Sequence, residues 1–440
     1  MALDELTPHA AYVLRTVEER KIRFVRLWFV DVLGLLKSTA FPVSELDQAL
    51  EEGVGLDGSA IESRARLWER DVIAHLDPTT LEVLPWRKGG GVARMFCDIR
   101  LPDGTPFPGD CREALRRQLA RAAELGYSFQ VGPEIEFFLF DEPDGDSEPR
   151  TLDEGSYFDL TAQDAGSDFR RRTVETMEQM GVPVKASHHE VAASQHEIDL
   201  KHTDALSMAD AIVTFRLAVK EVARELGIYA TFMPKPLDRL PGSGMHLHLS
   251  LTDLETERNV FYAEGDEPLS ETGRHFLAGI LAHAPELTAV TNQWVNSYKR
   301  LATGFESPQA ICWTRQANGA LVRVPSNRPG KESAARIELR SPDPACNPYL
   351  AFALVLAAGL DGIERRMELG AEAADDDLGG YPLLPEDLGA ATDLFESSEL
   401  ARATLGERLC EWFVANKRQE WSEYRATVTE YERHRYLRLL

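Results

Sequence analysis

The chain has 440 residues, of which 43% are hydrophobic, and this composition is typical of a globular protein rather than a disordered one. That length exceeds what one ordinary core supports, so we expect two domains, one of them large. The formal net charge of -24 argues against a nucleic-acid surface, because nucleic-acid phosphates would be repelled. It also means that an anionic substrate needs metal ions or clustered arginines in order to bind.

Features that would direct the chain to a membrane or an oxidising compartment are missing from the sequence. No stretch approaches the roughly 18 apolar residues of a spanning helix. The N-terminal segment is acidic and lacks the basic and apolar regions of a signal peptide, so we expect a cytoplasmic protein. The five cysteines are odd in number and far apart, which predicts reduced, buried thiols rather than a metal site.

The first hundred residues predict a small domain of mixed structure. Residues 8–20 have the spacing of an amphipathic helix, and residues 23–42 predict two strands joined by a turn near Asp31–Gly34. Proline and glycine then cluster, which indicates a boundary between one domain at 1–106 and a second at 107–440.

In the second domain, runs typical of strands alternate with helical patterns. This mixture predicts an α+β fold, with a sheet curved into a partial barrel and helices outside it. The predicted helices are 111–126, 204–226, 272–291, 347–367 and 398–426, and residues 369–386 predict an acidic loop.

Three apolar strands each carry polar side chains along one face. In residues 127–140, Glu134 and Glu136 share a face, because side chains alternate along a strand, and phenylalanines before and after them make that face largely apolar. The other two strands carry His246, His248 and Ser250 at 242–251, and Arg336, Glu338 and Arg340 at 335–344. A single histidine is more often a core residue with satisfied hydrogen bonds than a ligand, but three such strands together predict one polar cavity inside a curved sheet.

Carboxylates dominate this predicted cavity. The turn-rich segment 187–199 adds Glu190 and Glu197, although alone it could be an exposed loop. The resulting five carboxylates and one histidine suit Mg²⁺ or Mn²⁺ far better than zinc or copper. Five carboxylates exceed what one such ion needs, so the pattern favours two ions.

Arginines accompany the acidic residues, and guanidinium groups recognise phosphate and carboxylate through paired hydrogen bonds. The candidates are Arg300, Arg323, Arg336 and Arg340. An acidic metal cluster beside arginines predicts phosphoryl transfer from a metal-bound nucleotide. The sequence has no GxxxxGK[ST] motif, which excludes a P-loop enzyme.

Taken in order, these motifs resemble the glutamine synthetase family of the bacterial type over essentially the whole chain. They are LDGSAIE (56–62), VGPEIEFFLF (131–140), SHHEVAASQHEID (187–199), GSGMHLHLSL (242–251), NQWVNSYKRL (292–301), GFESP (304–308) and RIELRSPDPACNPYLAFALVLAAGLDGI (336–363). The resemblance implies a small N-terminal β-grasp domain and a large catalytic domain. It also implies a homo-oligomer, typically a dodecamer of two stacked hexameric rings, with active sites between neighbouring subunits.

Roles for individual residues follow from the same resemblance. It implies one metal at Glu136, Glu190 and Glu197, and another at Glu134, His246 and Glu338. It places Arg300 and Arg340 on the glutamate carboxylates with Gly242 and Glu136 beside the substrate, and His248, Ser250, Arg323 and Arg336 around ATP. It implies that Glu306 lies on a flap over the intermediate, and that Tyr157 and Asp57, the latter from a neighbouring subunit, lie near the incoming ammonium.

The implied reaction joins the γ-carboxylate of glutamate to an amine. ATP phosphorylates the carboxylate, which converts a poor leaving group into phosphate, and the amine displaces that phosphate. Metals and arginines would stabilise the charge on the transferring phosphoryl group. Closure of the flap would exclude water, and Glu306 and Asp57 would help to deprotonate the amine.

Several positions depart from the family pattern. Ala60 replaces a second serine after DGS, and Ser63–Arg64 replaces glycine and an aromatic residue. Asn318 stands where an arginine near the transferred phosphate is expected, with Arg315 or Arg328 as possible substitutes. The 369–386 loop lacks the tyrosine motif of adenylylated relatives, so we expect no such regulation.

Three interpretations remain open. The changes beside the amine site favour a ligase for a mono- or polyamine or an amino alcohol. Retention of Asp57, Tyr157 and Glu306 is consistent with a glutamine synthetase that uses ammonium. Asn318 raises the third hypothesis, a catalytically weak structural or regulatory paralogue, against which the complete set of metal ligands argues. A guanidino kinase would leave the DGS segment without a role.

Overall fold

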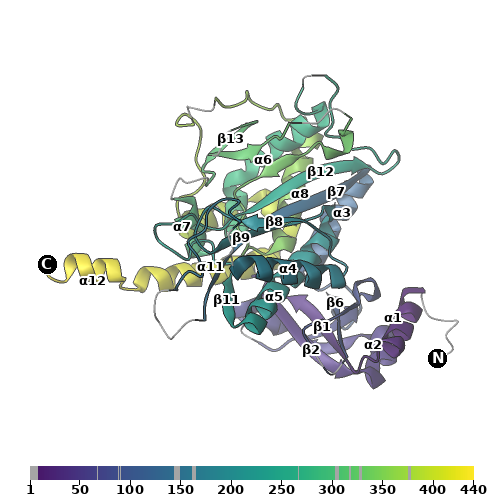
Figure 1. Ribbon diagram of the computed structural model, residues 1–440. Helices are drawn as coiled ribbons and strands as arrows, with labels where there is room; N and C mark the ends of the chain where they lie inside the picture. Colours follow the sequence, from purple (N-terminus) through teal and green to yellow (C-terminus); the bar gives the residue numbers. More distant parts are fainter. Residues whose placement is uncertain are drawn as a thin grey trace.

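Two β-sheets occupy different parts of the molecule in the computed structural model (Figure 1). The structure describes residues 8–66, 68–87, 89, 91–142, 149–160, 165–265, 267–302, 307–316, 319–326, 330–374 and 378–440. Within these ranges no helix is both long and apolar enough to cross a bilayer.

The smaller sheet has six strands in the order β2-β1-β6-β4-β3, with β5 paired to β6. β1 and β6 run parallel, and the other pairs are antiparallel. The predicted N-terminal helix and strand pair are confirmed. The elements are α1 (Pro8–Glu19), β1 (Phe24–Val30), β2 (Leu36–Pro42), α2 (Leu46–Glu52), β3 (Val54–Asp57), β4 (Asp71–Leu76), β5 (Glu82–Val83) and β6 (Val92–Arg100), with short 3₁₀ turns at Val43–Glu45, Gly58–Ala65 and Pro78–Thr80.

Asp31 and Gly34 build the predicted turn between β1 and β2. The Asp31 carboxylate accepts hydrogen bonds from the backbone N–H groups of Leu33 and Leu35 at 3.0 and 2.9 Å. Gly34 has φ of 75°, and a Cβ there would lie 2.7 Å from the Cα of Asn347. Glycine is therefore required where this turn meets the second part of the chain.

The larger sheet has nine strands in the order β13-β14-β15-β12-β7-β9-β8, and β10 and β11 also pair with β7. All pairs are antiparallel except β13 with β14. Its strands are β7 (Tyr127–Asp141), β8 (Val184–His189), β9 (Gln195–Leu200), β10 (Thr203–Asp204), β11 (Ile228–Thr231), β12 (Met245–Asp253), β13 (Ala310–Thr314), β14 (Ala320–Arg323) and β15 (Ile337–Leu339).

The register of this sheet aligns the predicted polar faces. His246 of β12 lies opposite Glu134 of β7, and Glu136 of β7 lies opposite Glu197 of β9. His248 of β12 lies opposite Glu338 of β15. Directly paired residues project to the same face of a sheet, so four neighbouring strands contribute to one polar surface.

Helices cover the larger sheet, and all five predicted helices are present (Figure 1). A buried α8 is apolar around its whole circumference, as expected for a helix in a core. The helices are α3 (Cys111–Glu124), α4 (Ala165–Gln179), α5 (Ala205–Leu226), α6 (Glu271–Thr291), α7 (Val295–Leu301), α8 (Pro348–Glu364), α9 (Leu388–Ser397), α10 (Glu399–Leu405), α11 (Glu407–Ala426) and α12 (Glu430–Tyr436), with a 3₁₀ turn at Glu332–Ala334.

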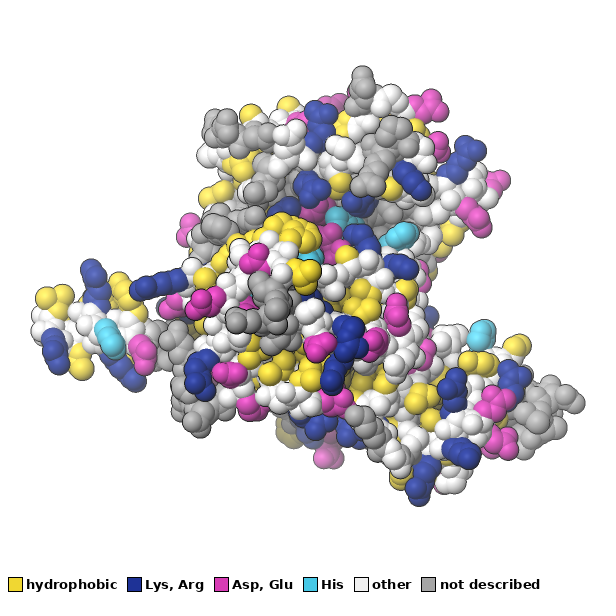
Figure 2. All heavy atoms as spheres, in the orientation of Figure 1, with side chains coloured by type: hydrophobic (Ala, Val, Ile, Leu, Met, Phe, Trp, Pro, Cys, Tyr) yellow, Lys and Arg dark blue, Asp and Glu magenta, His cyan; other side chains and the backbone are white. Residues whose placement is uncertain are grey.

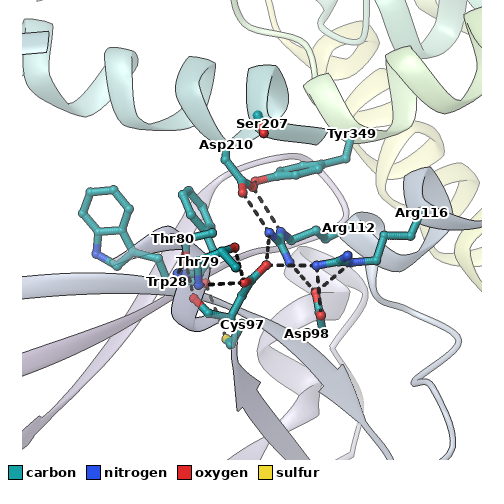
Figure 3. Close-up of polar contacts among 12 residues, drawn as sticks. Trp28, Thr79, Thr80, Cys97, Asp98, Arg112, Arg116, Ser207, Asp210 and Tyr349 are labelled. Carbon is teal, nitrogen blue, oxygen red and sulfur yellow. Dashed lines mark hydrogen bonds and ion pairs between the residues drawn. The ribbon is translucent and has the colours of Figure 1, made fainter. Parts of the chain in front are cut away.

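A buried ionic network joins the two parts of the chain (Figure 3). Arg112 of α3, 4% exposed, forms ion pairs with Asp77 and Asp98 of the N-terminal part at 2.7 and 2.5 Å. It also forms a pair with Asp210 of α5 at 2.9 Å, and the Tyr349 hydroxyl donates to the same aspartate at 2.5 Å. One guanidinium of α3 thus connects the N-terminal part of the chain with α5, which packs against β7 of the larger sheet.

Some boundaries in the sequence-based prediction were wrong. The strand predicted at 335–344 is only three residues long, Ile337–Leu339, and Pro342 and Pro344, which follow it, lack the N–H that would extend a ladder. The strand predicted at 242–251 begins at Met245. A break at Gly406 divides the predicted final helix into α10 and α11. All five cysteines are free and buried, as predicted.

Candidate active site

Glu134, His246 and Glu338 form the first acidic group of the site. His246 Nδ1 lies 3.7 Å from Glu134 Oε2 and 3.6 Å from Glu338 Oε1. One ligand atom from each residue falls within 4.8 Å of the others, which is a spacing that can hold a metal ion. Burial works against the charge on Glu134, but contacts with His246 and His248 outweigh it and lower the pKa of this carboxyl.

His188, Glu190 and Glu197 form the second group, on β8, β9 and the turn between them. His188 Nε2 lies 2.9 Å from Glu190 Oε1 and 3.7 Å from Glu197 Oε1. Glu136 lies beside both groups, with Oε1 4.0 Å from His246 Nε2. The structure therefore adds His188, which the sequence prediction omitted, to the expected set of Glu136, Glu190 and Glu197.

Negative charges in the second group lack full compensation. Burial and the charge of Glu190 raise the pKa of Glu136 to about 8. Burial and the charge of Glu136 raise the pKa of Glu197 well above its usual range. Carboxylates packed in this way repel one another unless a cation lies between them. The donor set of several carboxylates and imidazoles fits Mg²⁺ or Mn²⁺, so these residues are suited to divalent metal.

Gln195 connects the acidic residues to a neighbouring loop, and sequence reasoning missed it. Its side-chain nitrogen donates to Glu136 Oε2 at 2.9 Å and to the carbonyl of Gly242 at 3.1 Å. Its oxygen accepts from the N–H of Ala192 at 3.2 Å, so each end of the amide has a partner. A buried amide with all these contacts fixes the position of Glu136 relative to the predicted substrate loop. A neutral glutamine beside acidic residues gives no strong sequence signal.

The predicted arginines converge on the same sheet. Arg323 and Arg340 approach the two oxygens of Glu338 at 3.0 and 2.9 Å. Arg336 Nε donates to His248 Nδ1 at 3.1 Å. Arg300 of α7 is held by backbone carbonyls, including that of Ser341 at 2.7 Å. Cations thus border the acidic groups on the β14–β15 side, where an anionic substrate could bind.

A small cavity of about 20 Å³ lies where these groups meet. Figure 2 shows acidic, basic and histidine side chains gathered in a hollow on this face of the molecule. The lining residues include Glu136, Glu190, Gln195, Gly242, His246 and Arg300. An acidic wall faces a buried arginine, as expected if a metal ion and an anion bind next to each other.

Aromatic side chains border the second acidic group. Phe158 stacks on His188 with ring centroids 4.4 Å apart, and Tyr157 makes an edge contact with the same ring at 5.7 Å. Tyr157 is 54% exposed and Phe158 is 63% exposed. Tyr157, a predicted substrate residue, therefore lies at the edge of the acidic site.

Other predicted residues lie apart from these groups or outside the described part of the chain. Asp57 is exposed, and its carboxylate accepts from Ser59, Arg66 and the N–H of Arg70. Ser250 is half-buried on β12, where its backbone pairs with Gln130. The predictions for Glu306, Asn318 and Arg328 fall outside the described residues.

A third group, Asp153, His189 and His196, also has the spacing of a metal site. Its chemistry is less suitable, because Arg170 lies 2.8 Å from His196 Nδ1. Burial and this guanidinium lower the pKa of His196 to about 3. His189 bridges Asp153 and the carbonyl of Glu190 at 3.1 and 2.7 Å. The group therefore supports the turn that carries Glu190.

The chain has an α+β fold, and its candidate site places carboxylates suited to divalent cations beside arginines suited to anions, an arrangement typical of an enzyme that acts on phosphate groups. Residues 108–436 match the family described as glutamine synthetase, catalytic domain, and residues 21–102 match glutamine synthetase, beta-Grasp domain. The chain therefore belongs to the glutamine synthetase family and is an ATP-dependent ligase of that type.

Similar proteins support this assignment over nearly the whole chain. A glutamine synthetase of Mycolicibacterium smegmatis is 52% identical over 97% of this chain and 99% of the relative. One of Mycobacterium tuberculosis is 53% identical over the same shares. The solved structure described as a GmaS/ADP complex superposes with a TM-score of 0.88 at 35% identity, covering 97% of this chain and 99% of the other. The solved structure described as apo GmaS without ligand superposes with a TM-score of 0.87 at 35% identity, covering 98% of this chain and 100% of the other.

Proposed function

We propose that the enzyme joins the γ-carboxylate of glutamate to an organic amine, a mono- or polyamine or an amino alcohol, through γ-glutamyl phosphate. The observation that carries the choice of amine is the exposed aromatic surface of Tyr157 and Phe158 beside buried carboxylates. Acidic groups attract an alkylammonium ion, and aromatic faces stabilise cations and bury attached methylene groups. Ammonium alone has no carbon to bury.

Residues of the sheet would divide the remaining work. Glu136, Glu190 and Glu197 would hold one divalent ion, and Glu134, His246 and Glu338 a second. Bound ions would supply positive charge to the phosphates of ATP and to the transferring group. Arg300, Arg340 and Gly242 would orient glutamate. His248, Ser250, Arg323 and Arg336 would contact ATP.

In the second half-reaction the nitrogen lone pair of the amine attacks the γ-carbonyl carbon. The C–N bond forms as the C–O bond to phosphate breaks, and the amine loses a proton. A carboxylate near Tyr157 would accept that proton; the resemblance assigns this to Glu306 and to Asp57 of a neighbouring subunit. The exposure of Asp57 supports such a role between subunits, within a dodecamer of stacked rings.

Ammonium is the second candidate substrate. Mycobacterial relatives at 52% and 53% identity bear the name glutamine synthetase. The GmaS structures, at 35% identity, are of a γ-glutamylmethylamide synthetase and support use of an organic amine by this fold.

Phosphate release from ATP with Mg²⁺ and glutamate tests the proposal against ammonium, methylamine, ethanolamine and putrescine. We expect the largest kcat/KM with an organic amine, and mass spectrometry should detect its γ-glutamylamide. Phe158→Leu should lower kcat/KM for that amine and change the ammonium value little, because only the organic amine uses the ring. Leu160→Ser, at an exposed position nearby, is the control. A larger kcat/KM with ammonium would make the enzyme a glutamine synthetase.

A further inference from the structure

The Asp57 carboxylate is held by donors from both ends of one short turn. The 3₁₀ turn Gly58–Ala65 directly follows Asp57, the last residue of β3. At the start of the turn, the N–H and the hydroxyl of Ser59 donate to the carboxylate at 3.0 and 2.8 Å. Beyond its end, the Arg66 guanidinium and the N–H of Arg70 donate to it at 2.9 and 3.1 Å. The direction of this carboxylate therefore depends on the path of the backbone between Ser59 and Arg66.

Ser63 gives that backbone an unfavourable conformation. Its φ is 55° and its ψ is -122°, which puts a kink in the turn. A Cβ makes positive φ unfavourable, whereas glycine adopts it readily. The family pattern has glycine at this position, and this chain has a side chain instead. Such a conformation persists only where the surrounding structure fixes it.

Asn416 of α11 supplies the groups that fix it. Its side-chain oxygen accepts from the N–H of Arg64 at 2.9 Å, and its nitrogen donates to the carbonyl of Glu62 at 2.9 Å. This N–H and this carbonyl belong to the two peptide units on either side of Ser63, and the φ and ψ of Ser63 set their relative orientation. The same nitrogen also donates to the carbonyl of Trp412 at 2.8 Å, and Asn416 is 1% exposed. One buried amide thus fixes both dihedral angles of Ser63 against α11.

An ion pair also joins the turn to α11, but solvent weakens it. Arg64 Nη1 lies 2.8 Å from Glu423 Oε2, and both side chains are more than half exposed. Exposed ion pairs contribute little to stability, whereas loss of a buried amide leaves its polar partners without hydrogen bonds. The geometry of the turn therefore depends on Asn416 more than on the Arg64 side chain.

We propose that Asn416 is a positioning residue, which holds Ser63 in its unfavourable conformation and thereby directs the Asp57 carboxylate. The inference rests on the proposed function, in which Asp57 of one subunit acts on the amine in the site of its neighbour. Asn416 is buried, so it acts through the turn rather than by touching a substrate. Ammonium and an alkylammonium ion both present N–H groups to a carboxylate, so the inference holds for either nitrogen substrate.

Asn416→Leu tests the proposal, because leucine keeps the branched shape and removes both hydrogen bonds to the turn. Steady-state kinetics with ammonium and with methylamine should show the KM for the nitrogen substrate raised about tenfold. The KM for ATP and for glutamate should change little, since the turn carries none of the residues assigned to them. Hydrogen exchange of residues 58–66 should be faster than in wild type. Gln419→Leu, which removes an exposed amide from the same helix, is the control and should match wild type.

A second change separates positioning from general stability. Glycine adopts a φ of 55° without help, so Ser63→Gly/Asn416→Leu should recover most of the wild-type KM for the nitrogen substrate. Lys21→Gly/Asn416→Leu should not, although Lys21 also has a positive φ, of 53°, at an exposed site in α1's connection to β1. If both second changes restored the KM equally, Asn416 would only stabilise the fold and the proposal would be overturned.

Two further comparisons cover the other ways in which the test can fail. Should Asn416→Leu not fold, Ser63→Gly alone should still melt at a higher temperature than Ser63→Ala, because only glycine removes the Cβ; equal melting temperatures would overturn the proposal. Asp57→Asn should itself raise the KM for the nitrogen substrate. If it did not, the proposed role of Asp57 would be wrong; if it did and Asn416→Leu did not, the positioning role alone would be wrong.

Discussion

Replacing Arg112 with methionine should loosen the junction between the two parts of the chain. Methionine keeps much of the side-chain volume but removes the guanidinium, which leaves Asp77, Asp98 and Asp210 facing one another. Arg112 donates four hydrogen bonds to these carboxylates, at 3.1, 2.5, 2.7 and 2.9 Å, and its side chain is 4% exposed. Removing one partner from a buried ionic network costs about 3–5 kcal/mol, mainly because charges stay buried without compensation.

Arg116 provides a matched control on the same helix. It contacts Asp77 and Asp98 at 3.0 and 3.2 Å, but its side chain is 35% exposed. Exposed pairs contribute at most about 1 kcal/mol, so Arg116→Met should have a much smaller effect. The two variants remove the same charge from neighbouring turns and differ mainly in burial.

Urea unfolding followed by circular dichroism measures the difference, and hydrogen exchange locates it. We expect Arg112→Met to unfold at a lower midpoint urea concentration than wild type. We also expect faster hydrogen exchange of the backbone N–H groups of β4 and β6, which border the network. Arg116→Met should keep nearly wild-type values. If the two variants unfolded at the same urea concentration, the argument that burial sets the energy of this network would be wrong.

Three further changes test the site and the packing. Gln195→Leu should weaken Mn²⁺ binding about 10–100-fold, because a metal-binding carboxylate commonly loses that much affinity when a hydrogen bond to it is removed. Gln130→Leu removes a hydrogen bond to Ser128 and should leave Mn²⁺ binding unchanged. Isothermal titration calorimetry measures both affinities. The protonated His283 ring donates hydrogen bonds to the carboxylates of Glu286 and Asp361, which raise the pKa of His283. The contribution of His283 to stability should therefore be full below about pH 6.5 and should fall as the pH rises through the raised value. The melting temperatures of wild type and His283→Gln should therefore differ at pH 6 and converge by pH 9. A difference that stays constant with pH would contradict this. Gly279→Ala places a Cβ 2.1 Å from the carbonyl oxygen of Ala358, so it should destabilise the α6–α8 packing by about 1–3 kcal/mol in chemical unfolding, whereas Gly370→Ala, with open space around it, should be neutral.

Local sequence determined much of the secondary structure. The alternation in 127–140 produced β7, and the helical spacing of 204–226 and 272–291 produced α5 and α6 within a residue of the predicted ends. These segments are long and strongly periodic, so local pattern and tertiary packing favour the same structure. Segments with weaker patterns, such as α4 and α7, were not predicted.

Alternation also placed Glu134, Glu136, His246 and Glu338 on polar faces, because successive side chains of a strand point to opposite faces of the sheet. Which strands are neighbours is a different question, since pairing joins residues far apart in sequence. The order β15-β12-β7-β9 and its register decided that His246 lies opposite Glu134 and that Glu136 lies opposite Glu197.

Sequence alone determined the chemistry available to this protein, namely its carboxylates, histidines and arginines and the face of each strand on which they lie. Tertiary structure alone decided that Gln195 bridges Glu136 and Gly242, that Arg112 joins two domains, and that Asn416 of α11 fixes the turn that follows β3. The physical reason is that periodicity is a property of neighbouring residues in the chain. Hydrogen bonds, ion pairs and cavities depend on distances that exist only once distant segments have packed.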